Sequence, residues 1–266
     1  VKKGQFPDWM LNAIVNDLKV QRMKRWETAD GLATTLYSTY IGNRTWEQEL
    51  EEVNQYEAIT KADVVKFANE FFKENYVVVY KEKGVNDKLV RVENPGITPI
   101  KLNRDAQSPF LKEIINTKSS DIKPEFIDFK KAIATSTIKD KKVSFIKNKY
   151  NEVAQVNYVF PFGTDNDKEL ALGVTVLQYL GTDKYTPEQL KEEFYKLGIS
   201  NSFRTSNDQM IIALSGLESN MQKGVELMNH WINNVKADKG IYDQTVKTLL
   251  ESRKKKKKDK NRIMAA

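Results

Sequence analysis

The sequence predicts an α+β fold in which a largely antiparallel sheet has helices packed on one face, preceded by a helical segment. Three observations predict it. Residues 126–266 run in blocks of three strand-like stretches, two helical patterns, two strand-like stretches and two more helical patterns. Residues 1–84 are instead dominated by helical periodicity. Hydrophobic residues make up 40% of the chain, which is enough to build a core.

Residues 1–84 predict four helices followed by a strand. Each helix is indicated by apolar residues at helical spacing and by a residue that suits a helix start. The expected starts are Pro7–Asp8, Thr28, Trp46 and Thr60. The last is a capping box with Asp63 in place of the usual Glu. The β-branched and aromatic run 76–80 then predicts a strand.

Residues 85–125 differ from both flanks in composition and predict an interdomain connection. Four of the seven prolines lie here, and proline fixes an extended path. Apolar residues are interspersed with them, and we expect these to be buried against the flanking parts. They are Ile97, Ile100, Leu102, Phe110, Leu111, Ile114 and Ile115. We therefore expect three parts, namely residues 1–84, a hinge over 85–125, and residues 126–266.

Residues 126–266 predict five strands and four helices. The strands are expected over 132–138, 141–147, 153–162, 199–204 and 209–215, and the last two form a hairpin. The helices are expected over 168–180, 187–197, 218–235 and from 238 onward. The second helix has two independent start signals, a capping box from Thr186 to Gln189 and Pro187 at the first helical position. Gly198 is its stop.

Two residue counts limit the possible chemistry. The chain has no cysteine, which excludes disulfides and thiolate metal sites, and one histidine, which excludes any site that needs two imidazoles. That histidine, His230, is expected to lie at a core edge or on the surface. No uncharged apolar stretch is long enough to cross a membrane. The lack of cysteine does not fix the compartment, although the bacterial envelope is favoured over the cytoplasm.

The formal net charge is +7, and much of it lies in one run, Arg253–Lys258, followed by Lys260 and Arg262. Such a run can bind an anionic surface, but it is also typical of a solvated helix end. No aromatic residue interleaves with the lysines, so a stacking platform for nucleic-acid bases is missing. We therefore expect no nucleic-acid partner.

Four stretches of the sequence, taken in order, carry a resemblance to a known family: residues 59–84, 154–164, 170–182 and 189–198. They resemble, in turn, the end of a domain, a strand, the metal-binding helix and the stretch before the paired strands in the pitrilysin (insulinase, M16) family of zinc peptidases. The resemblance covers most of the chain. The resemblance implies an M16-like fold. It also implies a piece of a longer protein, which begins in the second half of one peptidase-like domain and stops inside the next.

The family's catalytic motif is absent from the corresponding helix. Family members bind zinc through H-x-x-E-H, in which both His are ligands and the Glu is the general base. Counted back from Gly181-Thr182, the ligand positions hold Leu172 and Val176, and the base position holds Thr175. None of them can bind zinc as an anion or imidazole. We therefore expect no catalytic residue, metal ligand or cofactor here, and zinc only in an active domain elsewhere in the parent.

The resemblance places the family's third ligand, a Glu on a later helix, near Glu251. A lone carboxylate cannot supply a zinc site, so we expect Glu251 to be a surface partner for Lys254 or Lys255.

As a whole, the resemblance implies a non-catalytic domain of a larger zinc metallopeptidase, forming part of its substrate chamber and hinge. The expected partners are peptide substrate and other domains of the parent chain. Strand Gln209–Ser215, if it lies at a sheet edge, is expected to pair with extended peptide. Two alternatives stay open: a basic surface-binding module that uses the lysine run, and a structural or assembly subunit with no link to proteolysis.

Overall fold

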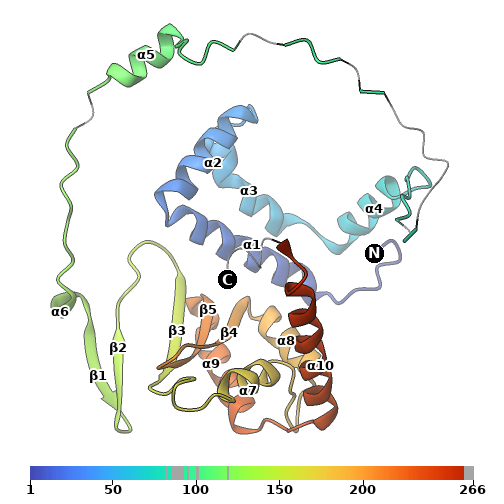
Figure 1. Ribbon diagram of the computed structural model, residues 1–266, viewed down its shortest axis with the longest axis vertical. Helices are drawn as coiled ribbons and strands as arrows, with labels where there is room; N and C mark the ends of the chain where they lie inside the picture. The colour runs from blue at the N-terminus through green and yellow to red at the C-terminus, as the bar shows by residue number, and fades with distance from the viewer. Residues whose placement is uncertain (82, 85–92, 95, 100–101, 119, 261–266) are drawn as a thin grey trace. The chain divides into compact units, whose positions relative to one another are not determined.

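The computed structural model describes residues 1–81, 83–84, 93–94, 96–99, 102–118 and 120–260 (Figure 1). The chain forms two compact units: residues 1–73 together with residues from 147 onward, and residues 74–146. Part of the predicted hinge, including Pro95 and Ile100, lies outside the described residues, as does Arg262. The division of the chain at residues 84 and 125 stays a prediction.

Four helices open the chain, and each begins within two residues of its predicted start. They are α1 (Trp9–Trp26), α2 (Ala29–Ile41), α3 (Trp46–Ala58) and α4 (Lys61–Phe71). Thr28 caps α2 by accepting a hydrogen bond from the Gly31 amide. At Thr45 and Thr60 both bonds of the capping box are made. Local cap chemistry therefore decides where α2, α3 and α4 start, whereas Asp8 makes no side-chain cap bond at the start of α1.

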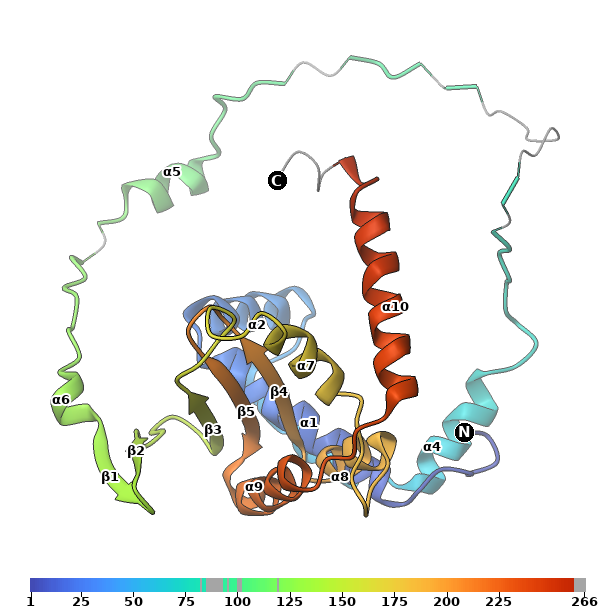
Figure 2. The ribbon, with the colours of Figure 1, turned by 60° about the horizontal axis from the view of Figure 1, so that its bottom comes forward.

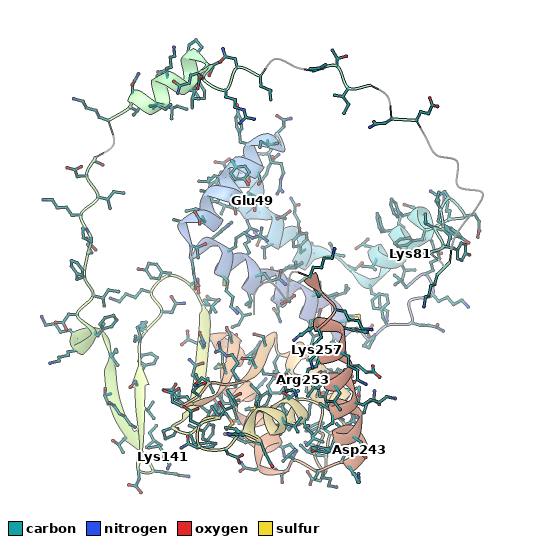
Figure 3. The ribbon with its side chains drawn as sticks, in the orientation of Figure 1. Glu49, Lys81, Lys141, Asp243, Arg253 and Lys257 are labelled. Carbon is teal, nitrogen blue, oxygen red and sulfur yellow. The ribbon has the colours of Figure 1, made fainter. Side chains whose placement is uncertain are left out.

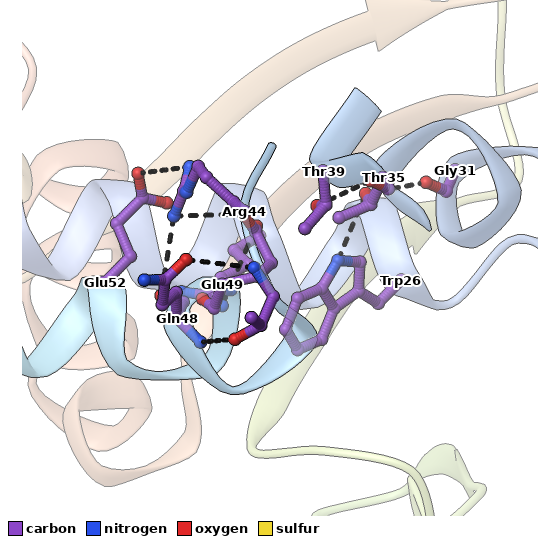
Figure 4. Close-up of polar contacts among 10 residues, drawn as sticks. Trp26, Gly31, Thr35, Thr39, Arg44, Gln48, Glu49 and Glu52 are labelled. Atoms are coloured by element: carbon purple, nitrogen blue, oxygen red, sulfur yellow. Dashed lines mark hydrogen bonds and ion pairs between the residues drawn. The ribbon is translucent and has the colours of Figure 1, made fainter. Parts of the chain in front are cut away.

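Polar contacts join the first three helices to one another (Figures 3 and 4). Glu49 is buried on α3, and its carboxylate faces Arg22 of α1 at 3.8 Å and Arg44 at 3.3 Å. Trp26 Nε1 donates a hydrogen bond to Thr35 Oγ1 at 3.3 Å, which links α1 to α2. The carboxylate tolerates burial because two guanidinium groups face it.

The predicted strand at 76–80 is wrong. These residues form no strand, and their side chains are exposed, with Val77 and Val79 90% and 87% exposed. A β-branched run becomes a strand only when a neighbouring segment pairs with its backbone N–H and C=O groups. No such pairing exists among the strands of the described residues.

The described residues within 74–146 form two short helices and a hairpin. The elements are α5 (Pro109–Asn116), α6 (Phe129–Ala132), β1 (Ala134–Ile138) and β2 (Lys141–Phe145). The strands pair in antiparallel fashion, as predicted, and Lys139 and Asp140 turn between them with φ of 46° and 63°. Positive φ at both turn residues is the type I′ geometry that suits the twist of a hairpin.

The hinge prediction missed α5 and misplaced its apolar side chains. Ser108 caps α5 by accepting from the Leu111 amide, and Pro109 takes the first helical position. The apolar residues that we expected to be buried are exposed wherever the structure describes them, as with Ile97, Leu102 and Phe110. Apolar character alone does not bury a side chain, because burial also requires a surface to pack against.

The second sheet is antiparallel, with strand order β3-β5-β4 (Figure 2). Its strands are β3 (Val153–Phe160), β4 (Ile199–Thr205) and β5 (Met210–Leu217). The helices are α7 (Leu170–Leu177), α8 (Pro187–Lys196), α9 (Glu218–Asn233) and α10 (Lys239–Lys256). The predicted α+β class is confirmed. The single five-stranded sheet is wrong, since the described strands form two sheets and β1 pairs only with β2.

The core of the larger unit, residues 1–73 with residues from 147 onward, lies on one face of the β3-β5-β4 sheet. Phe203 of β4 pairs with Ile212 of β5 in the register, so both side chains project from the same face. They belong to one buried cluster with Leu190 and Phe194 of α8 and with residues of α7 and α9. Helix packing on one face was predicted. On β4 the two buried apolar side chains, Ile199 and Phe203, are an even number of residues apart and so project from this same face.

Helix α1 also packs in this unit, although 120 or more residues separate it from the sheet. The Trp9 ring meets the Tyr195 ring edge-on at 6.3 Å, and Lys196 Nζ lies 5.0 Å from the Trp9 ring centroid. Helix α1 contacts α8, β3 and β5. Among the helices that the structure describes, none combines the length and apolar character needed to span a bilayer.

Candidate functional site

Helix α7 takes the place at which the resemblance puts the metal-binding helix. Val176 is buried and Leu172 is half-buried. The Thr175 hydroxyl donates a hydrogen bond to the Ala171 carbonyl at 2.8 Å, so it is held against its own helix. The three positions offer two aliphatic side chains and one neutral hydroxyl. These residues do not fit a zinc ion, which requires imidazole, thiolate or carboxylate ligands.

A groove of about 500 Å³ lies between α7, α8 and α10. Its walls carry Thr175 and Tyr179 from α7; Pro187, Glu188 and Lys191 from α8; and Gly240, Ile241, Gln244, Thr245, Thr248 and Leu249 from α10. The Lys191 ammonium lies 5.7 Å from the Tyr179 ring centroid, a cation–π contact. A groove of this volume, with mixed apolar and polar walls, accommodates a small ligand or a few side chains of a peptide.

One face of α10 forms the far wall of the groove. Ile241, Thr245, Thr248 and Leu249 recur at intervals of three and four, which places them on the same side of the helix. Helices α7 and α10 lie side by side (Figure 2). The sequence reasoning did not identify this wall. The small and apolar residues at helical spacing were the signal for it, although that signal does not name a partner helix.

His230 joins α9 to the loop after α7. Its Nε2 lies 3.1 Å from Thr182 Oγ1 and 3.8 Å from Asp183 Oδ1, and its ring meets Tyr185 edge-on at 5.5 Å. The side chain is half-buried, as expected for a residue at the edge of a core. It does not line the groove.

Glu251 is exposed on α10 and is not part of the groove wall. The ion pairs between described residues do not include the expected pairing with Lys254 or Lys255. Across the part of the chain that the structure describes, no three His, Cys, Asp or Glu side chains gather in a way that could hold a metal ion.

The strand proposed for peptide pairing is not at an edge. β5 is hydrogen-bonded to β3 on one side and to β4 on the other, so its backbone groups are already used. The expectation of β-augmentation along Gln209–Ser215 is therefore wrong. The nearly continuous apolar run of β5 indicates that both faces of the strand are covered, but it carries no signal about which strands pair with its backbone.

Comparison with known proteins gives a family for the second part of the chain. Residues 142–265 match the model of the insulinase family, peptidase family M16. No curated protein matches. Solved structures that the chain matches include a protease from Helicobacter pylori (15% identity, TM-score 0.42) and a peptidase M16 inactive domain from Pseudomonas fluorescens (14%, 0.45). The periplasmic protease PqqL from Escherichia coli is a third (13%, 0.42).

These structures are all longer than this chain. The matches cover 47%, 50% and 90% of this chain, and 31%, 34% and 29% of the respective neighbours. The chain thus spans about a third of the length of the structures that it matches. The helix, the groove and the three-stranded sheet described above all lie within residues 142–265, the part of the chain that matches the model of the insulinase (M16) peptidase family.

Proposed function

We propose that this chain is a non-catalytic part of a larger M16 zinc metallopeptidase and that it binds peptide without cleaving it. One observation carries the proposal. At the positions of the family's two ligands and base, α7 presents Leu172, Val176 and Thr175, and the Thr175 hydroxyl is hydrogen-bonded to its own helix. Hydrolysis by the family's chemistry needs a general base and a metal-bound water, and these side chains supply neither.

The groove supports a binding role beside the inactive helix. It reaches α7 through Tyr179 and through Thr175, the residue that the resemblance aligns with the family's general base. Its walls combine apolar side chains with hydroxyl, amide and charged groups, as peptide-binding grooves do. Residues 85–125 would connect this domain to the preceding part of the parent and would act as the hinge.

Peptide binding and turnover can be measured on the same sample. A fluorescent peptide of mixed composition, incubated with the 266-residue chain and zinc chloride, is expected to bind saturably by anisotropy and to remain intact by mass spectrometry. Cleavage that a chelator abolishes would overturn the non-catalytic assignment. The absence of saturable binding would overturn the peptide-binding role.

A matched pair of variants assigns the binding to the groove. Thr248→Trp places an indole in the groove wall and is expected to weaken binding. Leu250→Trp places the same ring on an exposed position about 160° around α10 from Thr248 and is expected to leave binding unchanged. An equal loss of peptide affinity in both variants would show that binding does not use the groove.

A further inference from the structure

The groove continues along α10 into a positively charged surface. The wall residues Ile241, Thr245, Thr248 and Leu249 define one side of the helix. Continued at the same spacing, that side carries Ser252 and then Lys255 and Lys256. Both lysines are exposed. The groove and these two ammonium groups therefore form one continuous surface along α10.

The distance between the apolar and cationic ends has the scale of a short peptide. Leu249 and the two lysines are six and seven residues apart, which is about 10 Å at 1.5 Å per helical residue. An extended peptide covers that distance in about three residues, at 3.3 Å each. When one side chain of the peptide is held beside Leu249, the peptide residues about three positions further along therefore lie next to Lys255 and Lys256.

We infer that the groove is selective for acidic peptides, in which an apolar anchor side chain fills the groove and carboxylates about three residues away pair with Lys255 and Lys256. The inference rests on the proposed peptide-binding function and adds a substrate class to it. Charge complementarity is the argument for an acidic partner, since ammonium groups at the mouth of a groove attract carboxylates and repel basic segments. No base-stacking aromatic accompanies the lysines, so nucleic acid is not favoured.

The other lysines of the run provide an internal control. Helical rotation of 100° per residue turns Lys254 and Lys257 to the opposite side of α10 from the groove. Lys255→Glu/Lys256→Glu and Lys254→Glu/Lys257→Glu therefore change the net charge equally, and only the first pair changes the groove side. Their comparison separates a directed contact from the effect of total charge.

The experiment uses the whole 266-residue chain and three fluorescent peptides that share one phenylalanine. One peptide carries two glutamates three residues from the phenylalanine, the second carries two glutamines there, and the third two lysines. We expect the glutamate peptide to bind most tightly and the lysine peptide most weakly. Charge reversal at Lys255 and Lys256 is expected to lower the affinity for the glutamate peptide about tenfold at low salt. Charge reversal at Lys254 and Lys257 is expected to lower it less than about twofold.

The outcomes separate this inference from the proposed function. If all three peptides bind equally and neither double variant changes that, the domain binds peptide but does not select acids, and only this inference fails. If no peptide binds, the proposed function fails as well. If heparin binds like the glutamate peptide and both double variants weaken the two ligands equally, the run is a general polyanion binder and the inference is overturned.

Discussion

Helices α4 and α8 begin in the same way but have different surroundings. Both open with a capping box in which a threonine and the third helical residue exchange hydrogen bonds. On α8, Leu190 and Phe194 are almost completely buried, whereas on α4, Phe67 and Phe71 are 57% and 61% exposed. The comparison teaches that local signals start a helix in either setting. Whether its apolar face is covered depends on what the rest of the chain brings to it.

The sharpest test of this comparison is the removal of one phenylalanine from each helix. Phe194→Ala is expected to destabilise the chain by about 3 to 5 kcal/mol, because it leaves a cavity in the core. Phe67→Ala is expected to cost less than about 1 kcal/mol, because the ring is largely in water already. Urea unfolding followed by tryptophan fluorescence measures both. Similar losses of unfolding free energy in the two variants would show that the apolar face of α4 is buried in solution.

The boundaries of α4 and α8 were predictable because caps are local. Thr60 with Asp63, and Thr186 with Gln189, lie within one turn of each other, so a window of four residues contains the whole interaction. The hairpin of β4 and β5 was predictable for the same reason. The central place of β5, the independent β1–β2 hairpin and the failed strand at 76–80 all depend on which distant segment supplies a pairing partner.

The candidate site shows the same limit. The residues of α7 that the resemblance aligns with the family's motif could be read directly from the sequence, because the motif spans one helix. The groove could not be read in this way, since its walls come from three helices and α10 follows α7 by more than 60 residues. Its α10 wall became visible only once the packing of α10 against α7 was known.

Two glycines sharpen the contrast between crowded and open positions. A Cβ at Gly216 of β5 would lie 2.5 Å from the Gly198 carbonyl oxygen, a backbone atom that cannot move aside cheaply. Gly216→Ala is therefore expected to destabilise the chain by about 1 to 3 kcal/mol. A Cβ at Gly173 of α7 would meet nothing within 4 Å.

Gly173→Ala is the matched control and is expected to act in the opposite direction. An open glycine inside a helix loses backbone entropy on folding, so alanine should stabilise the chain by up to about 1 kcal/mol. Thermal unfolding of both variants gives the two signs. Destabilisation by Gly173→Ala would show that α7 is covered on that side.

A smaller effect is expected from the cap of α8. Thr186→Ala removes the oxygen that accepts from the Gln189 amide and should cost about 1 kcal/mol in global unfolding. The corresponding Thr60→Ala should act mainly on local opening of α4, because little packing ties α4 to the core. Hydrogen exchange of the two helices distinguishes the cases. A global loss from Thr60→Ala would contradict this.

The smallest expected effect distinguishes the two caps by pH. Hydrogen bonds from the Thr60 side chain and backbone lower the pKa of Asp63 below its usual 3.8. The stabilisation from this cap is therefore present above the pKa of the unfolded chain and is lost as the pH falls through the folded pKa. Gln189 does not titrate, so the two hydrogen bonds of the α8 cap should be kept over the same range.

An NMR titration from pH 6 to pH 2, following the backbone amides at the starts of α4 and α8, checks this difference. Asp63→Asn keeps a side-chain acceptor without a titrating group and is expected to remove the change at α4. If both helix starts shift alike, acid unfolding of the whole chain is the cause and the cap is not.

The last turn of α10 has a consequence for any assembly that includes this domain. Successive residues of a helix are 100° apart, so the six consecutive cations of Arg253–Lys258 project in every direction around the axis; Figure 3 labels Arg253 and Lys257, one turn apart. An apolar neighbour would have to strip water from ammonium groups whichever way it approached, at a cost of several kcal/mol for each ion. Only water or anionic surfaces can border this tip without that cost, which restricts how other domains are arranged around it.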